Sequence, residues 1–284
     1  MQTVTFKSVY RATLRAWSRD PDTANLTSAE QEVFADRITA AAKEGIEHAF
    51  WPDCMLIEQR MFRDAWSGST TYALGAEIYY AGNYYTSLQA TNLNKNPATE
   101  TTWWELTTEL DRYIPWAQTG KTAIGTAKAV SKRNPRVSRY PDYIPFTISE
   151  NGIQVTDLAP AEVYLEYRRR PPTFTRAAYS ASIAYVAGNR VYYDATGECY
   201  LCILAGTNKT PSTETTYWTK IDMPAFLELY IPIRVRVEAL TDDGQEEMRE
   251  KLQNEADLQL DKYMRAIFRQ QGQYVTARVA TYGS

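Results

Sequence analysis

The sequence predicts an α+β protein with a helical bundle from the N- and C-terminal segments, a central antiparallel β domain and two small inserted three-stranded β modules. Apolar residues recur at three- and four-residue spacing near both ends, alternate in the middle of the chain, and accompany an aromatic-rich segment that occurs twice. We therefore expect five parts along the chain. They are residues 1–63 (N-terminal helical part of the host domain), 64–107 (first module), 108–176 (central β domain), 177–222 (second module) and 223–284 (C-terminal helical part and tail).

The N-terminal part is predicted to contain two helices. The first follows the apolar spacing from Phe6 to Trp17. The second begins at a capping box, for which Thr27–Glu30 and Ser28–Gln31 both have the right residues, and continues to Phe50. His48 lies near its end, where a single histidine is expected to be a surface or capping residue.

The central part is predicted to be built from β strands. Apolar residues alternate from Ile144 to Ile148 and from Val163 to Tyr167, which indicates strands with one buried face. Asn151-Gly152 is a strong signal for a hairpin turn. The run Arg168-Arg169-Arg170 before two prolines is expected to be a solvated strand edge, with a site for phosphate or an acidic partner as the alternative.

The C-terminal part is predicted to contain a long helix. Apolar residues from Met248 to Ile267 hold helical spacing, with acidic residues at the start and arginines at the end, and Gly272 stops the pattern. The segment 224–240 fits both a strand and a helix, so its fold is left undecided. The tail Tyr274–Val279 is short and apolar, and is expected to be loose unless it docks on a neighbour.

The repeated segment spans Gly75 to Trp104 and recurs from Gly188 to Trp218. Both copies contain a glycine, an Ile or Val followed by two tyrosines, a later tyrosine, and an Asn-Lys-x-Pro-x-Thr-Glu-Thr-Thr run before a closing aromatic pair. Each copy offers three short β-rich runs separated by turn residues, which is typical of a small antiparallel meander. About 40 residues is marginal for independent folding, so Trp and Tyr side chains are expected to supply most of the core.

These residues resemble the small chitin- and cellulose-binding modules. The resemblance implies a flat sugar platform with an exposed aromatic pair after the second tyrosine, but this chain has Gln89-Ala90 and Leu204-Ala205 at those positions. The residues expected to fold the modules are present: Tyr79, Tyr85 and Trp104 in one copy, and Tyr192, Tyr200 and Trp218 in the other. The aromatic residues that remain as candidates for weak glycan contact are Trp66, Trp103 and Tyr217.

The order of helices, module, β domain, module and helices is similar to that of a group of tailed-bacteriophage virion proteins. The stretches that carry the resemblance span most of the chain: Phe50-Trp51-Pro52, Glu58-Gln59-Arg60, Ala65-Trp66, Pro145–Val155, Val163–Phe174 and Asp222–Phe226. The resemblance implies a head-to-tail connector, or adaptor, of the virion neck that is made in the bacterial host cytoplasm. Implied partners are the portal protein, tail proteins and further copies of the chain in a dodecameric ring, with DNA only passing through the channel.

Charge and cysteine content limit the other classes of function. The chain has 31 Lys and Arg against 34 Asp and Glu, a net charge of −3, so net charge does not predict recruitment of nucleic acid. No stretch approaches the ~18 uninterrupted apolar residues of a membrane span, and no membrane partner is expected. The chain has three cysteines, Cys54, Cys199 and Cys202. We interpret Cys199 and Cys202 as buried strand residues, because strand positions three apart point to opposite faces and do not form a joint site.

No catalytic, cofactor-binding or metal-binding residues are predicted. A serine or cysteine triad needs a histidine, and His48 is the only one. No glycine-rich phosphate-binding pattern, metal-ligand cluster or glycosidase-like acidic run is present. We therefore expect a structural protein without enzyme activity. The alternative is a glycan-binding virion or surface protein whose two modules grip host polysaccharide by avidity.

Overall fold

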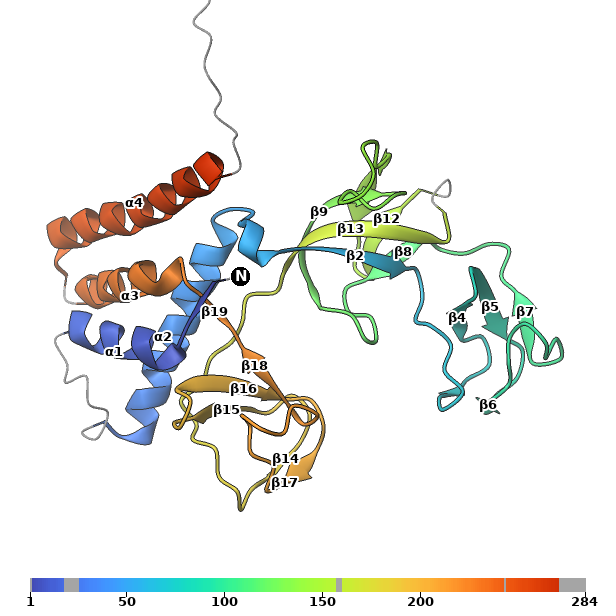
Figure 1. The fold of residues 1–284 in the computed structure, drawn as a ribbon, viewed down its shortest axis with the longest axis horizontal. Helices are drawn as coiled ribbons and strands as arrows, with labels where there is room; N and C mark the ends of the chain where they lie inside the picture. The colour runs from blue at the N-terminus through green and yellow to red at the C-terminus, as the bar shows by residue number, and fades with distance from the viewer. Residues whose placement is uncertain (1, 18–25, 157–159, 243, 271–284) are drawn as a thin grey trace, which may run out of the picture. The chain divides into compact units, whose positions relative to one another are not determined.

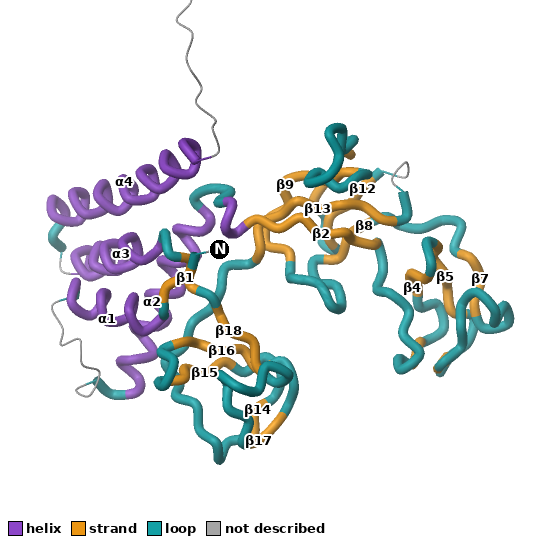
Figure 2. Tube along the Cα trace, viewed as in Figure 1, coloured by secondary structure: helices purple, strands orange, loops and turns teal. Residues whose placement is uncertain are grey.

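The chain has the mixed α+β fold that the sequence predicts (Figures 1 and 2). The computed structural model describes residues 2–17, 26–156, 160–242 and 244–270. These residues divide into two compact units. One unit contains residues 1–53 and 171–284 and holds the helices and the second module, and the other contains residues 54–170 and holds the central β domain and the first module. The boundaries of the five parts expected from the sequence remain predictions.

Helices from the two chain ends pack together in the first unit, as expected. The elements are β1 (Thr3–Val4), α1 (Phe6–Ala16), α2 (Ser28–Glu47), the 3-10 helix Pro52–Cys54, β19 (Met223–Pro224), α3 (Leu227–Asp242) and α4 (Glu246–Gln270). β1 pairs with β19, and α3 contacts α1, α2 and α4. The core of this unit is therefore assembled from segments about two hundred residues apart in the sequence, consistent with modules inserted into a host domain.

The helix α2 begins at the predicted capping box and ends earlier than predicted. The Thr27 hydroxyl accepts a hydrogen bond from the Glu30 amide, and the Glu30 carboxylate accepts one from the Thr27 amide. The prediction of a helix reaching Phe50 is wrong, because α2 ends at Glu47 and exposed His48 is its C-cap. The surface and capping interpretation of His48 is confirmed.

The undecided segment 224–240 is mostly the helix α3. Ile231, Val235 and Val237 alternate like strand residues, yet all three are buried. A helix that is covered on several sides by other helices can be apolar around most of its circumference, which removes the amphipathic pattern. Pro232 lies inside this helix.

The long C-terminal helix is confirmed as α4. It begins at Glu246, so the predicted acidic start at Asp242 belongs instead to the end of α3. The predicted stop at Gly272 and the tail Tyr274–Val279 lie outside the described residues.

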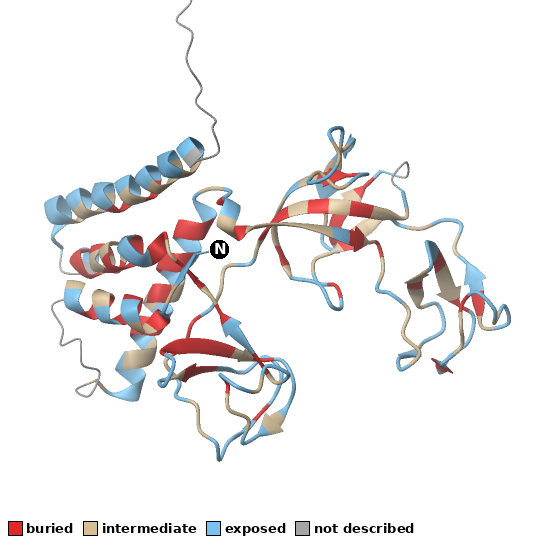
Figure 3. Cartoon of the chain, in the orientation of Figure 1, coloured by how far each residue is buried: buried red, intermediate tan, exposed pale blue. Residues whose placement is uncertain are grey.

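Two antiparallel sheets form the central β domain. One has the order β10 (Tyr143–Ile144), β9 (Ile124–Ser131), β13 (Glu162–Arg169) and β2 (Met55–Met61), and the other has the order β11 (Phe146–Ile148), β12 (Gly152–Val155) and β8 (Tyr113–Pro115). The alternation predicted from Val163 to Tyr167 is confirmed, because Val163, Leu165 and Tyr167 are fully buried (Figure 3).

The hairpin predicted at Asn151-Gly152 is confirmed, with Ile148 opposite Ile153 across the turn. Gly152 has a φ of 153°, and a Cβ atom there would overlap the carbonyl oxygen of Ile114 on β8. The expected single strand from Ile144 to Ile148 is wrong, since Pro145 separates β10 from β11 and Ile148 is 61% exposed. Proline cannot donate a backbone hydrogen bond to a continuing ladder.

The arginine run does not form a solvated strand edge. Arg168 and Arg169 belong to β13, which lies between β9 and β2 in the sheet. Arg168 is buried and donates a hydrogen bond to the hydroxyl of Thr126 at 2.9 Å, while exposed Arg170 donates to the Ile124 carbonyl. The prediction of a strand edge was wrong because β13 pairs with β9 on one side and β2 on the other, and local sequence does not show such pairing with distant segments.

Both repeats fold as three-stranded meanders with an added two-stranded ladder, which confirms the three-stranded prediction. The first module contains β3 (Thr71–Tyr72), β4 (Glu77–Tyr80), β5 (Asn83–Ser87), β6 (Asn92–Leu93) and β7 (Trp104–Leu106). The second contains β14 (Ala184–Tyr185), β15 (Arg190–Tyr193), β16 (Glu198–Cys202), β17 (Gly206–Thr207) and β18 (Trp218–Ile221).

Candidate functional site

The same hydrogen bonds hold both modules together. The indole nitrogens of Trp104 and Trp218 donate to the carbonyls of Lys95 and Lys209, each at 2.8 Å. The two indoles also meet a tyrosine edge-on at ring-centroid distances of 5.3 and 5.1 Å. The closing tryptophan is therefore the centre of each module core, as the sequence predicts.

Each module attaches to its unit through one face of the strand pair, which we call the docking face. In the first module the docking face consists of Tyr79 and Tyr84, which lie opposite each other on β4 and β5. In the second it consists of Tyr192 and Cys199, at the corresponding positions on β15 and β16. Because side chains alternate along a strand, this face is opposite the face that packs on the closing tryptophan.

Tyr84 joins the first module to the core of the central β domain. Its hydroxyl accepts a hydrogen bond from the Phe62 amide at 3.0 Å and donates to the Ala161 carbonyl at 2.5 Å. The Tyr79 hydroxyl donates to the Glu162 carboxylate on β13. Burial raises the pKa of both tyrosines to about 12, and the hydrogen bond to Glu162 adds to the effect at Tyr79. Both phenols are therefore fixed as neutral hydrogen-bonding groups.

The docking face of the second module packs against the start of α1. The rings of Phe6 and Tyr192 are 5.9 Å apart, and the Arg176 guanidinium lies 3.7 Å from the Tyr192 ring centroid. The Cys199 thiol donates to the Thr175 carbonyl at 3.2 Å. Burial raises the pKa of Cys199 to about 12, which leaves an unreactive thiol.

Backbone contacts strengthen this second attachment. The first amides of a helix have no partner inside the helix, and here two of them bond to the module. The Phe6 amide donates to the Glu198 carboxylate at 3.3 Å, and the Lys7 amide donates to the Gly197 carbonyl at 2.9 Å. Burial raises the pKa of Glu198, against the opposing effects of the Phe6 amide and Lys220.

The docking faces correct one expectation from the sequence. Tyr79 and Tyr192 were expected to fold the modules, but both face outward from the module core and contact the host instead. Tyr200 does belong to the core of the second module, together with Tyr185, Val191, Cys202 and Trp218. Cys199 and Cys202 are buried, unpaired and on opposite faces of β16, as predicted.

The three residues predicted for glycan contact are half-buried. The Trp66 ring packs edge-on against Tyr80, and its indole nitrogen is buried without a hydrogen-bond partner among the described residues. Trp103 and Tyr217 occupy corresponding positions before the closing tryptophans. The ammonium groups of Lys95 and Lys209 lie 5.3 and 4.7 Å from their ring centroids.

Each module exposes several aliphatic side chains. Leu74 and Leu88 are 66% and 38% exposed in the first module, and a hydrogen bond of 2.8 Å from the Gly75 amide to the Ser87 carbonyl brings their turns together. In the second module Ile203 corresponds to Leu88, and exposed Val186 and Leu204 lie one residue away from the positions that correspond to Leu74 and Leu88. We call these five residues the aliphatic ends. The sequence pattern showed only that Leu204 stands where an aromatic residue was expected, and it did not reveal the exposed aliphatic side chains of both modules.

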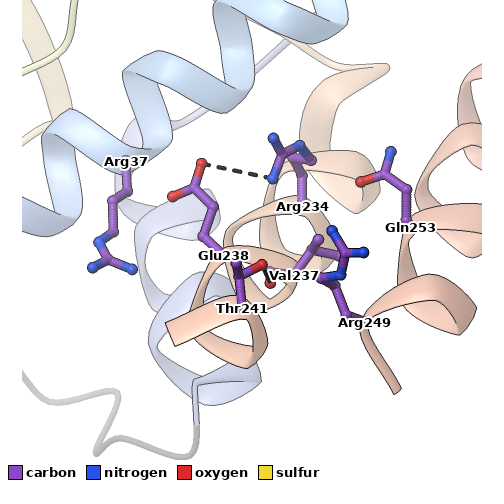
Figure 4. A pocket seen from close by; sticks show the side chains of 7 residues that line it. All are labelled: Arg37, Arg234, Val237, Glu238, Thr241, Arg249 and Gln253. Atoms are coloured by element: carbon purple, nitrogen blue, oxygen red, sulfur yellow. Dashed lines mark hydrogen bonds and ion pairs between the residues drawn. The ribbon is translucent and has the colours of Figure 1, made fainter. Parts of the chain in front are cut away.

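A cavity of about 390 Å³ lies among α2, α3 and α4 (Figure 4). Arg37, Arg234, Arg249 and Glu238 contribute its charged side chains. Arg234 pairs with Glu44 at 2.7 Å and with Glu238 at 3.6 Å, and Arg249 pairs with Glu246 at 2.6 Å. These carboxylates already neutralise two of the guanidinium groups, so the cavity is best explained as an ion-pair network that connects helices.

No family model matches the chain, and no curated protein or solved structure matches it either. Among the described residues, no group of three or more His, Cys, Asp or Glu side chains could hold a metal ion. None of the described helices is both long and apolar enough to cross a membrane.

Proposed function

We propose that this protein is a non-catalytic assembly protein, specifically a head-to-tail adaptor of a tailed-bacteriophage neck that forms a ring between portal and tail. The observation that carries the assembly role is the pairing of a fixed attachment with exposed aliphatic side chains in both modules. Both modules are attached by the docking face, and both expose the side chains of their aliphatic end. Exposed aliphatic residues at or next to matching positions of the two repeats favour contact with protein, because sugar rings are recognised chiefly by aromatic platforms.

The specific place in a virion neck comes from the resemblance in the sequence and from the layout. A helical bundle made from both chain ends matches the part expected to bind the portal, and the modules are inserted elements of the kind that decorate such a host. A closed ring requires contacts between different surfaces of neighbouring copies. The aliphatic ends are suitable contributors to such contacts.

Light scattering of the full chain, alone and mixed with purified portal rings, tests the proposal. We expect a defined increase in mass on the portal that corresponds to a ring of this chain. The double variant Leu74→Ser/Leu88→Ser should weaken ring formation, whereas Leu106→Ser, which is 56% exposed on β7 away from the aliphatic end, should not. A chain that stays monomeric with the portal and binds chitin or host polysaccharide would favour the glycan-binding alternative.

A further inference from the structure

A strongly basic loop connects β9 to β10 in the central β domain. Residues 132–142 contain Lys132, Arg133, Arg136 and Arg139, and Asp142 is the only acidic residue. Lys132 pairs with Asp142 at 3.3 Å. The three arginines remain as an uncompensated local positive charge in a chain whose net charge is −3.

The three arginines differ from other basic residues in the same unit. Arg60, Arg63 and Lys128 form ion pairs of 2.5 to 2.8 Å with carboxylates. Arg133, Arg136 and Arg139 are exposed, and no described carboxylate lies within ion-pair distance of them. Their guanidinium groups are therefore available to an external anion.

Hydrogen bonds fix the backbone of this loop. Lys132 and Arg133 donate their amides to the carbonyls of Asp142 and Pro141, each at 3.0 Å, which extends the β9–β10 ladder. The Asn134 carbonyl accepts from the amides of Val137 and Ser138, and its side chain accepts from the Arg136 amide. The arginines thus project from an ordered turn, which reduces the entropy lost on binding.

Exposed aromatic side chains accompany the arginines. Tyr140 is 72% exposed and Tyr143 is 60% exposed, and the Arg139 guanidinium lies 5.7 Å from the Tyr140 ring centroid. Val137 at the tip is 84% exposed. The loop leaves the end of β9 and extends beyond the sheet (Figure 1). A protruding tip with three guanidinium groups and two tyrosines can contact phosphates and stack on bases.

We propose that the loop 132–142 binds nucleic acid through its sugar-phosphate backbone. Planar guanidinium groups match phosphate oxygens, and such contacts do not depend on base sequence. An acidic protein surface also attracts guanidinium groups, and the polyglutamate arm of the test below separates this partner from nucleic acid. This inference does not depend on the adaptor proposal.

Fluorescence anisotropy with a labelled DNA duplex and the matching single strand tests this proposal. Binding of the full chain should weaken steeply between about 50 and 200 mM salt, as counterion release requires. The variant R133Q/R136Q/R139Q should bind at least about tenfold more weakly, and the slope of log affinity against log salt should fall by about 2 to 3, close to one unit for each lost phosphate contact.

The matched control removes the same charge elsewhere. The variant R11Q/R190Q/K251Q neutralises three exposed basic residues on α1, β15 and α4 and should leave binding within about twofold of the unmodified chain. Comparison of duplex with single strand shows which form of nucleic acid the loop prefers. Unchanged binding by the loop variant, no binding at about 50 mM salt, or binding to polyglutamate but not to DNA would overturn the proposal.

Discussion

The two modules share an internal structure but are attached to different hosts. Inside each module the closing tryptophan, its hydrogen bond to a lysine carbonyl and its tyrosine neighbour are the same. On the docking face the first module has Tyr84 where the second has Cys199. The side chains that fold the module are thus retained. On the docking face, Tyr79 and Tyr192 are the same residue type, and the position of Tyr84 and Cys199 differs with the host.

The contacts of the two docking faces also differ in what they reach. The first module contributes Tyr84 to the core of the β domain, and the second holds the start of α1 through Tyr192 and Glu198. A module rigidly attached in this way can act as a fixed protrusion of a larger assembly.

The largest expected effects come from the closing tryptophans. Trp104→Ala and Trp218→Ala should each reduce the free energy of unfolding by about 3 to 5 kcal/mol, because each removes a buried ring and a hydrogen bond. Urea unfolding followed by circular dichroism measures the change. Trp103→Ala, at the half-buried neighbouring position, should cost about 1 kcal/mol. Equal losses at Trp103 and Trp104 would contradict the assignment of the core.

Removal of one docking hydroxyl should have an intermediate effect. Tyr84→Phe leaves the Phe62 amide and the Ala161 carbonyl without their partner and should cost about 1 to 3 kcal/mol. Cys199→Ala in the second module should cost less, because a thiol is a weak donor. Urea midpoints of the two variants test this order. A larger loss from Cys199→Ala would mean that the second attachment depends on this side chain more than the first depends on Tyr84.

High pH should weaken the first attachment through Tyr84. The pKa of Tyr84 is raised from 10.0 to about 12, so its contribution to stability is complete below pH 10 and is lost as pH rises through 12. Thermal unfolding between pH 9 and 12 should show a steeper loss for the unmodified chain than for Tyr84→Phe. Parallel curves would show that Tyr84 ionises freely and is not held by the β domain.

The smallest effect is expected for the exposed ion pair at the second attachment. Lys7 and Asp194 are 3.0 Å apart, and the Asp194 side chain is 74% exposed. Asp194→Asn should change the free energy of unfolding by less than about 1 kcal/mol. The hydrogen bond from Lys7 lowers the pKa of Asp194, so its contribution is present above pH 3.8 and disappears as the carboxylate is protonated below it. Chemical unfolding at pH 3 and pH 7 checks both points.

Secondary-structure elements were predicted from the sequence more accurately than the contacts between distant segments. The repeat, the capping box at Thr27 and the hairpin at Asn151-Gly152 depend on local residue chemistry, and all three have the expected structure. The roles of Tyr79 and Arg168 depend on which distant segment covers each face of a strand. The local spacing of residues carries no information about which distant segment packs against a strand.

The surroundings of the candidate site residues could not be predicted from the sequence. Trp66, Trp103 and Tyr217 were chosen by resemblance, which does not show that neighbouring side chains occupy part of their ring surfaces. The basic loop was missed because the net charge of −3 averages over the whole chain. A count of charge in short windows would have found Lys132 to Arg139.

Amide hydrogen exchange at Phe62 and Lys7 tests the central claim most directly, namely that both modules are attached through their docking faces. The Phe62 amide donates to Tyr84, and the Lys7 amide, in the first turn of α1, donates to Gly197 of the second module. We predict that both exchange as slowly as the core strand β13, because attachment protects them. Exchange of either amide at the rate of an exposed loop would show that the corresponding module moves freely, which would contradict the account.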